Sequence, residues 1–176
     1  CSSDLDGGKS WTIVFEEKNA DAFFDGMAFD ISGQSGWLMG DPLNGEVYLL
    51  RTIDAGRSWT RHPSDRSPHV ARGIAAFAAS GTHLLLRQNG DLLIGFGGMP
   101  DGKPASEMFQ ASVLRTADRG ESWKQIEVPL KADTSSGIFS ICDVSPDSDR
   151  LVAVGGDYRQ LDRTEENIVV SNDGGV

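Results

Sequence analysis

The chain has 176 residues, of which 39% are hydrophobic, and its 26 acidic and 16 basic residues give a formal net charge of −10. This composition predicts a soluble globular protein with a packed core, and the 21 glycines indicate many tight turns. The negative charge argues against nucleic acid and anionic membrane surfaces as partners, because both reward clusters of lysine and arginine.

The chain opens at Cys1 and contains no apolar run that approaches the roughly 18 residues of a membrane helix, so we expect no membrane span. Cys1-Ser2-Ser3 has two interpretations: the acylated start of a mature bacterial lipoprotein, or the end of an interrupted strand. We favour the strand, because a repeated motif begins at Asp4 and leaves no tether. The chain carries no signal peptide pattern.

Short strand patterns bounded by turn residues fill the rest of the chain, and no helical period appears, which predicts an all-β fold. The apolar run that ends at Cys142 predicts that this thiol is a small buried residue. The expected strands are 25–31, 35–40, 46–52 and 58–62; then 73–79, 82–87 with 91–96 competing for the second place, 111–116 and 122–127; and finally 137–143, 150–155 and 166–171.

Four copies of one short signature follow or precede these strands. Two copies, Thr52–Trp59 and Thr116–Trp123, fit Ser/Thr-x-Asp-x-Gly-x-x-Trp completely. Asp4–Trp11 has Asp in the first place, and Ser171–Gly175 fits as far as the chain extends. The recurrence indicates a repeat protein. The motif positions are Asp6, Gly8 and Trp11; Thr52, Asp54, Gly56 and Trp59; Thr116, Asp118, Gly120 and Trp123; and Ser171, Asp173 and Gly175.

The signature predicts a stapled β-hairpin. A strand ends at the Ser/Thr, whose hydroxyl ties down the turn, and the Asp accepts backbone N–H bonds. The Gly supplies a positive φ angle, and the Trp opens the returning strand with its ring packed over the hairpin.

This pattern resembles the Asp-box, or bacterial neuraminidase repeat, of β-propellers such as sialidases, some glucanases and sortilin-type receptors. Gly36–Asp41 followed by Tyr48–Thr52 is similar, more narrowly, to bacterial propellers related to the photosystem II assembly factor, as are Phe23–Gly26, Phe77–Thr82 and Gly155–Tyr158. The likeness covers nearly the whole chain. It implies a β-propeller of Asp-box type and an exported, periplasmic or extracellular protein.

The motif aspartates at 6, 54, 118 and 173 are 48, 64 and 55 residues apart, close to the ~40 to 50 residues of a propeller blade. We therefore expect a partial propeller of about three four-stranded blades, 12–62, 63–127 and 128–176, with residues 1–11 ending a preceding blade. Three blades do not close a ring. The chain is then either a fragment of a six- or seven-bladed ring, which we favour, or one half of a dimer. Either way, unpaired blade edges predict self-association.

The resemblance implies that the motif hairpins are structural and that ligands bind at the opposite face. Loops at that face carry the candidate binding residues Asp25, Asp41, Arg72, Asp157, Tyr158 and Arg159, alongside the alternative that these are ordinary solvated residues. The long loop 97–104 is of the type that often carries function.

Catalytic and metal motifs are weak. No Arg-Ile-Pro of the sialidase type occurs, no Gly-x-Ser-x-Gly elbow is present, and the three histidines lack metal-ligand spacing, so we expect no metal and no cofactor. We therefore interpret the chain as a non-catalytic binding or assembly scaffold for a protein or carbohydrate ligand. The alternatives are a glycoside hydrolase of the neuraminidase-repeat type and a purely structural module.

Overall fold

The computed structural model describes residues 8–77, 81–104, 107–146, 148–162 and 167–175, and these contain strands and turns but no helix. Accordingly, the described residues include no helix long and apolar enough to cross a membrane. The strands are β1 (Phe24–Phe29), β2 (Gly36–Leu43), β3 (Glu46–Thr52), β4 (Thr60–Arg61), β5 (Ile74–Ala75), β6 (Leu84–Leu86), β7 (Leu92–Gly98), β8 (Phe109–Thr116), β9 (Lys124–Ala132), β10 (Ser136–Asp143), β11 (Leu151–Asp157) and β12 (Ile168–Ser171).

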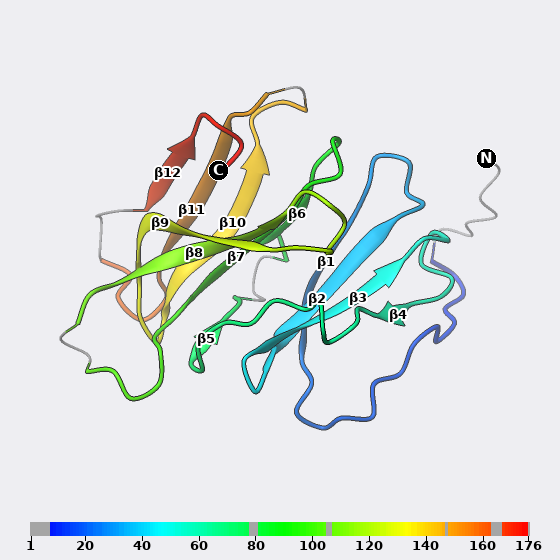
Figure 1. Ribbon diagram of the computed structural model, residues 1–176, viewed down its shortest axis with the longest axis horizontal. Helices are drawn as coiled ribbons and strands as arrows, with labels where there is room; N and C mark the ends of the chain where they lie inside the picture. Colours follow the sequence, from blue (N-terminus) through cyan, green and yellow to red (C-terminus); the bar gives the residue numbers. More distant parts are fainter. Residues whose placement is uncertain (1–7, 78–80, 105–106, 147, 163–166, 176) are drawn as a thin grey trace.

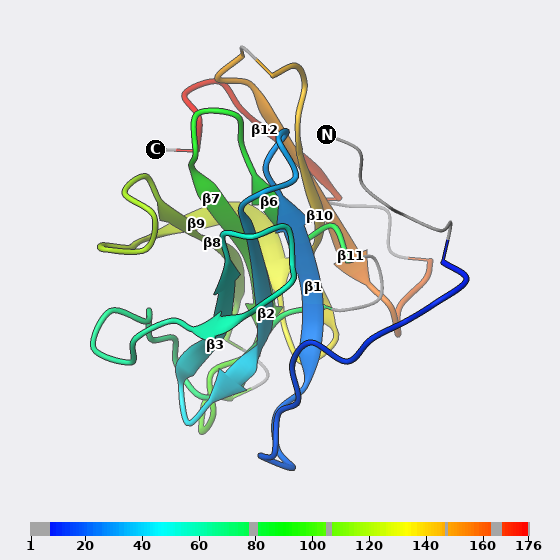
Figure 2. The same ribbon diagram turned by 90° about the vertical axis from the view of Figure 1, so that its right-hand side faces the viewer.

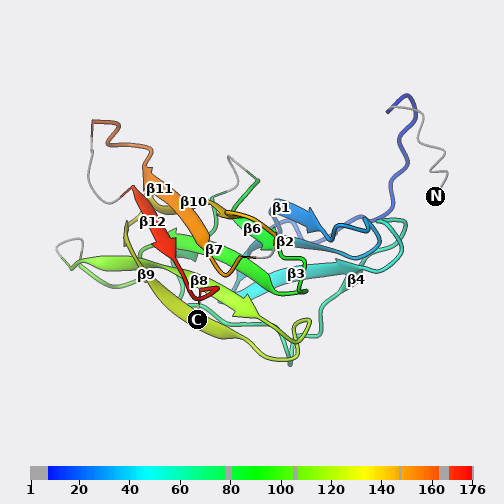
Figure 3. The same ribbon diagram turned by 90° about the horizontal axis from the view of Figure 1, so that it is seen from above.

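Three antiparallel groups of strands follow one another along the chain (Figure 1). The first group is the sheet β1-β2-β3-β4, the second runs from β6 through β7 and β8 to β9, and the third is β10-β11-β12. A single bridge between Gly97 and Gly137 connects the second group to the third, so these two form one eight-stranded sheet. Seen from above, the groups are arranged side by side as a curved row (Figure 3).

The sequence predicts most of these strands. In the first group the expected strand 58–62 shortens to Thr60–Arg61, and the larger differences lie in the second group. The segment 92–98 (β7) is the central second strand. Two short strands share its edge: β6 pairs with the start of β7, and β5 with its end. The expected strand 73–79 therefore shrinks to two residues, and its last two positions, 78 and 79, lie outside the described residues.

The core consists of two apolar layers, one between the first and second groups and one between the second and third. Figure 2 shows the strands of the first group in front of those of the second. The first layer joins β2 and β3 to β6, β7 and β8, with Met39, Leu49 and Phe96 fully buried. The second joins β7, β8 and β9 to β10 and β11 around Leu93 and Ile138. Strand β7 contributes to both layers with alternate side chains, because successive residues of a strand point to opposite faces. This explains its nearly continuous apolar sequence.

One buried cation also holds the second and third groups together. The Arg87 guanidinium donates from Nε to Asp143 Oδ1 (2.8 Å) and from Nη2 to the carbonyl of Ser148 (2.7 Å). Asp91 lies 3.8 Å from Arg87 Nη1 and also accepts hydrogen bonds from Arg115. Burial of a charge requires such partners, so this network links the turn after β6 to the turn after β10.

Cys142 corrects the sequence interpretation, because its side chain is exposed. Strand β10 has an irregularity between Ile138 and Ser140, where Phe139 has no partner in β11. This bulge shifts the alternation, so that Ile138 and Ile141 both face the core and Cys142 faces outward.

Candidate functional site

All six candidate binding residues lie at the same edge of the sheets. We call this the loop edge: the starts of β1 and β10 and the ends of β2, β7 and β11. Phe24 pairs with Gly40, Ser136 with Asp157 and Gly97 with Gly137, so the antiparallel pairing brings these strand ends together. Asp25 and Asp41 lie at its β1–β2 part, and Asp157, Tyr158 and Arg159 at its β11 part.

Asp25 and Asp41 form a pair of carboxyl groups, of which Asp25 is buried and Asp41 is half-buried. Asp25 is only 7% exposed, and neither its Oδ2 nor Oδ1 of Asp41 has a hydrogen-bond partner. Burial, followed by repulsion from Asp41, raises the pKa of Asp25 to about 7. Burial also raises the pKa of Asp41, against the opposing effect of the Ala76 backbone N–H. Near neutral pH this pair is therefore partly protonated.

His83 packs beside the same strand and is a residue that the sequence did not single out. Its side chain is fully buried, and neither ring nitrogen has a hydrogen-bond partner. A Cβ atom on Gly26 would lie 3.0 Å from His83 Cε1, so the glycine makes room for the ring. Burial lowers the pKa of His83, which favours the neutral imidazole.

In the part of the chain that the structure describes, no group of three or more His, Cys, Asp or Glu side chains is placed to hold a metal ion. The His62 ring instead bonds through Nε2 to the carbonyl of Gly120 at 3.1 Å.

Asp157 organises the β11 part of the loop edge. Its Oδ1 accepts hydrogen bonds from Ser135 Oγ and from the backbone N–H of Arg159, both at 2.8 Å, and the carboxylate is buried. Tyr158, by contrast, is 50% exposed, and the Arg159 guanidinium lies 5.6 Å from the centre of its ring. The buried carboxylate therefore fixes a turn that presents an aromatic ring and a cation to solvent.

Phe77, which follows β5, packs against the β11 part of the loop edge. Its ring makes edge contacts with Phe139 (5.1 Å between centroids) and Tyr158 (6.1 Å). A Cβ atom on Gly97 would lie 2.6 Å from Phe77 Cε2, so the absence of a side chain there leaves room for the ring. The sequence pattern placed Phe77 in a strand and gave no sign of this role.

Arg72 lies at the same edge, beyond the ends of β2 and β7, but in a small cavity of its own. Its Nη2 donates to Asn44 Oδ1 at 3.1 Å, and it lines a small cavity of about 270 Å³ with Asp101 and Ile74. The backbone of Asp101 also bonds to the Arg72 carbonyl. The structure thus places the six candidates in three environments: an acidic pair, an exposed aromatic turn and a separate polar cavity.

The repeated signature forms the same hydrogen bonds in each described turn. In the first turn (Thr52–Trp59), Thr52 Oγ1 donates to Asp54 Oδ1 (2.8 Å) and accepts from Gly56 N (3.0 Å). Asp54 also accepts from the backbone and hydroxyl of Ser58. The second turn (Thr116–Trp123) repeats all four bonds.

The third turn (Ser171–Gly175) has the corresponding Ser171–Asp173 and Gly175–Ser171 bonds, at 2.6 and 2.9 Å. The motif glycines Gly8, Gly56, Gly120 and Gly175 all have positive φ angles, between 72° and 91°, as predicted. Asp6 lies outside the described residues. Hydrogen bonds to the carboxylates lower the pKa values of Asp54 and Asp118 to about 2.

The tryptophans of the signature differ in their surroundings. Trp59 lies over Gly56 and against Phe29, and Trp11 lies over Gly8 and donates from Nε1 to its carbonyl at 2.9 Å. Trp123 packs instead against the first apolar layer.

Each of the later turns also contacts the preceding group. A Cβ atom on Gly120 would lie 2.7 Å from His62 and 3.0 Å from Trp37, both in the first group. Gly175 is positioned similarly, within contact distance of Leu93 in the second group.

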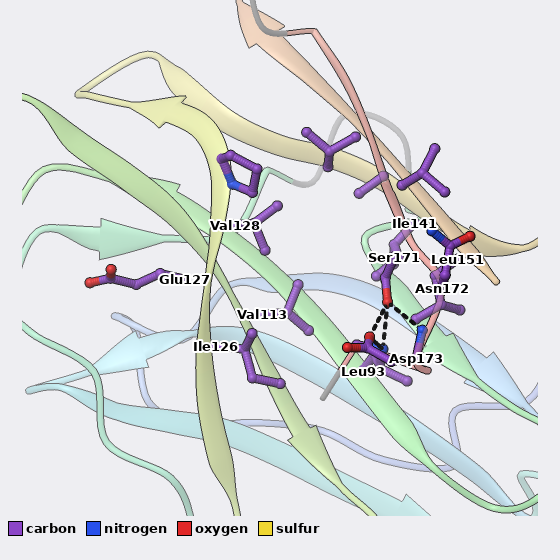
Figure 4. Close-up of a pocket in the computed structure, with 15 residues that line it drawn as sticks. Leu93, Val113, Ile126, Glu127, Val128, Ile141, Leu151, Ser171, Asn172 and Asp173 are labelled. Atoms are coloured by element: carbon purple, nitrogen blue, oxygen red, sulfur yellow. Dashed lines mark hydrogen bonds between the residues drawn. The ribbon is translucent and has the colours of Figure 1, made fainter. Parts of the chain in front are cut away.

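A further cavity lies away from the loop edge, between β9 and β12 (Figure 4). It has a volume of about 420 Å³ and a mainly apolar lining that includes Leu93, Val113, Ile126, Ile141, Leu151 and Val169. Polar groups are contributed by the third turn, whose Ser171 and Asp173 lie at one side of the cavity.

Comparisons with known proteins identify the fold. No family model and no curated protein matches the chain. Among solved structures, a GH74 xyloglucanase from Xanthomonas campestris is similar, with a TM-score of 0.55 and 18% identity over 86% of this chain and 22% of that one.

A protein of unknown function from Dyadobacter fermentans has a TM-score of 0.58 and 17% identity, over 97% of this chain and 47% of that one. The chain thus spans less than half the length of either neighbour. At this level of identity the likeness concerns the fold alone, and the xyloglucanase belongs to a β-propeller family. The chain has an all-β, propeller-like fold.

Proposed function

We propose that the chain is part of an Asp-box β-propeller that serves as a non-catalytic binding or assembly scaffold. The three strand groups correspond to the blade units 12–62, 63–127 and 128–176 of a six- or seven-bladed ring. The shared hydrogen bonds of the turns support this assignment, because unrelated Asp-Gly turns have no reason to reproduce the same two contacts in all three turns and the same four in the first two. The proposal includes an exported location, in keeping with the resemblance to photosystem II assembly factor relatives.

The binding role rests on a contrast between the carboxylates of the loop edge and its exposed aromatic and basic side chains. Its carboxylates are buried or bonded within the protein, whereas Tyr158 and Arg159 are exposed. An exposed aromatic ring beside a guanidinium binds polar ligands by stacking and by hydrogen bonds, and this arrangement supplies no acid or base to a reaction. The ligand is accordingly a carbohydrate or a protein surface.

One observation favours the alternative, a glycoside hydrolase. Asp25 has a raised pKa of about 7 and lies next to a second carboxyl group, and a general acid needs a raised pKa. Glycoside hydrolysis, however, requires two carboxyl groups on either side of one bond, about 5 to 9.5 Å apart. Asp25 and Asp41 repel each other. Neither residue lines the cavity between β9 and β12, the cavity beside Arg72, or a third cavity beside the first turn, which Thr52 and Ser58 help to line.

Xyloglucan is a direct probe, because it is the substrate in the name of one structural neighbour. Calorimetry measures binding and release of reducing ends measures hydrolysis. The scaffold predicts binding without hydrolysis, and Tyr158→Ala weakens binding about tenfold, whereas Leu161→Ala, an exposed residue of the same loop, leaves it unchanged. Reducing-end release that Asp25→Asn abolishes would instead support the hydrolase. If neither binding nor hydrolysis of xyloglucan is detected, the purely structural alternative gains support, and the next experiment tests binding to proteins.

A further inference from the structure

The cavity beside Arg72 is a polar site between the first and second strand groups. Three segments line it: the tight turn between β2 and β3, residues 71–74, which lead into β5, and the loop after β7 at Asp101. In Figure 1, β5 lies beside the turn between β2 and β3. The volume of about 270 Å³ corresponds to about nine water molecules in the liquid, so the cavity holds a small molecule.

Contacts within the protein fix the three segments relative to one another. The Asp101 backbone N–H donates to the Arg72 carbonyl at 2.7 Å, and Arg72 Nη2 donates to Asn44 Oδ1 at 3.1 Å. Gly73 has a φ angle of 89°, and a Cβ atom there would collide with the Met99 carbonyl oxygen and lie 2.8 Å from Asp101 Oδ1. The glycine therefore allows the two loops of the second group to approach closely. A site held in this way needs little ordering when a ligand binds.

The cavity lining carries two opposite charges that do not pair with each other. Of the described residues that line it, Arg72 is a cation and Asp101 a carboxylate, and the others are uncharged. The ion pairs of the described residues include neither of them. Arg72 bonds instead to the neutral amide of Asn44, which uses one of the five N–H groups of the guanidinium. The arginines that do pair with a carboxylate are Arg61, Arg66, Arg87 and Arg115.

The charges select the class of ligand. A molecule with only a carboxylate is attracted by Arg72, but it is repelled by Asp101 and by the net charge of −10 of the protein. A molecule with only an ammonium group is repelled by Arg72. A neutral polyol forms hydrogen bonds with both side chains, but bonds in which both partners are charged are stronger. A small molecule that carries one charge of each sign satisfies both side chains.

We propose that this cavity binds a small zwitterion with the head group of an α-amino acid. The Arg72 guanidinium holds the carboxylate through the N–H groups that Asn44 leaves available, and the Asp101 carboxylate accepts hydrogen bonds from the ammonium group. The inference goes beyond the proposed function, because it concerns a different site from Tyr158 and Arg159 and does not depend on the ligand bound there.

The first test compares ligands that differ in one charge. Glycine is the smallest α-amino acid, N-acetylglycine lacks its ammonium group, glycinamide lacks its carboxylate, and glucose is a neutral polyol. Each is titrated into the ¹⁵N-labelled protein, and the backbone amide signals of Gly73 and Asp101 are followed by NMR. We expect glycine to shift both signals and the other three compounds to bind at least tenfold more weakly. Equal or tighter binding of any of the three, or no shift with glycine, overturns the proposal.

The second test removes one charge of the protein at a time. Arg72→Gln and Asp101→Asn are each expected to weaken glycine binding at least tenfold. The matched controls are Lys103→Gln, in the same loop as Asp101, and Asp65→Asn, in the connection between β4 and β5, and they leave glycine binding unchanged. All four side chains are exposed, so the variants keep the melting temperature of the wild type.

Equal weakening by the controls would reduce the effect to general electrostatics and overturn the proposal. The two proposals also fail separately. Glycine binding without any binding of xyloglucan would support this site and count against the carbohydrate ligand of the proposed function. Xyloglucan binding without glycine binding would support the proposed function and overturn this site.

Discussion

Replacement of Asp25 by asparagine has an effect on stability whose size and sign follow from the structure. Burial and Asp41 raise the pKa of Asp25 to about 7, roughly three units above the usual value of an aspartate. The folded protein therefore binds a proton that the unfolded chain releases between about pH 4 and pH 7. Each unit corresponds to about 1.4 kcal/mol, so the wild-type protein loses up to about 4 kcal/mol of unfolding free energy as the pH rises through this window.

Asparagine has nearly the shape of the protonated acid and does not ionise. We therefore expect Asp25→Asn to match the wild type near pH 4 and to exceed its unfolding free energy by up to about 4 kcal/mol at pH 8. Urea unfolding followed by tryptophan fluorescence at both pH values measures the difference. Asp162→Asn, at an exposed carboxylate, is the control. If the difference in unfolding free energy between Asp25→Asn and the wild type is the same at pH 4 and pH 8, the conclusion that Asp25 is buried with a raised pKa is wrong.

The remaining predictions concern the turns and the sheet contacts. Thr116→Val removes the hydroxyl that accepts a hydrogen bond from the Gly120 N–H. We expect the unfolding free energy, measured in urea, to fall by about 1 to 3 kcal/mol, and an unchanged value would contradict a stabilising role for this bond. Ala55→Gly relieves a φ angle of 61° and should stabilise by about 0.5 to 1 kcal/mol, seen as a higher melting temperature; destabilisation would argue against strain there. Gly97→Ala would place a Cβ atom 2.5 Å from the carbonyl of Ser136 and should lower the melting temperature strongly, whereas Gly156→Ala, whose nearest contact is 3.7 Å, should not.

The parts of the fold that the sequence predicts are those specified by local chemistry. The signatures that begin at Thr52, Thr116 and Ser171 each combine a hydroxyl, a carboxylate and a glycine within five residues, so the groups that hold the turn together can be identified from the sequence. The turn also sets where the preceding strand ends, as it does for β3 at Thr52 and for β8 at Thr116. This explains why β5 and β6, which end in no such turn, were assigned less well.

The features that the sequence does not predict depend on irregular pairing or on distant contacts. Asp25 is the extra residue of a bulge between Phe24 and Gly26, and nothing in the local sequence indicates that this acid is buried. A second bulge reverses the expected orientation of Cys142. At the loop edge, Phe77 reaches Tyr158 only because the second and third groups meet at Gly97. A pairing between segments 40 residues apart has no local sequence signal.

The contact of each turn with the preceding group gives the fold a direction. Gly120 of the second group packs on Trp37 and His62, and Gly175 of the third packs on Leu93, so the surface that receives a unit is always supplied by the unit before it in the chain. In arrays of this kind stability is shared between neighbours. Synthesis on the ribosome releases the units in the same order, so each new unit emerges beside a template that has already formed. Folding can then advance from one unit to the next without waiting for the whole chain.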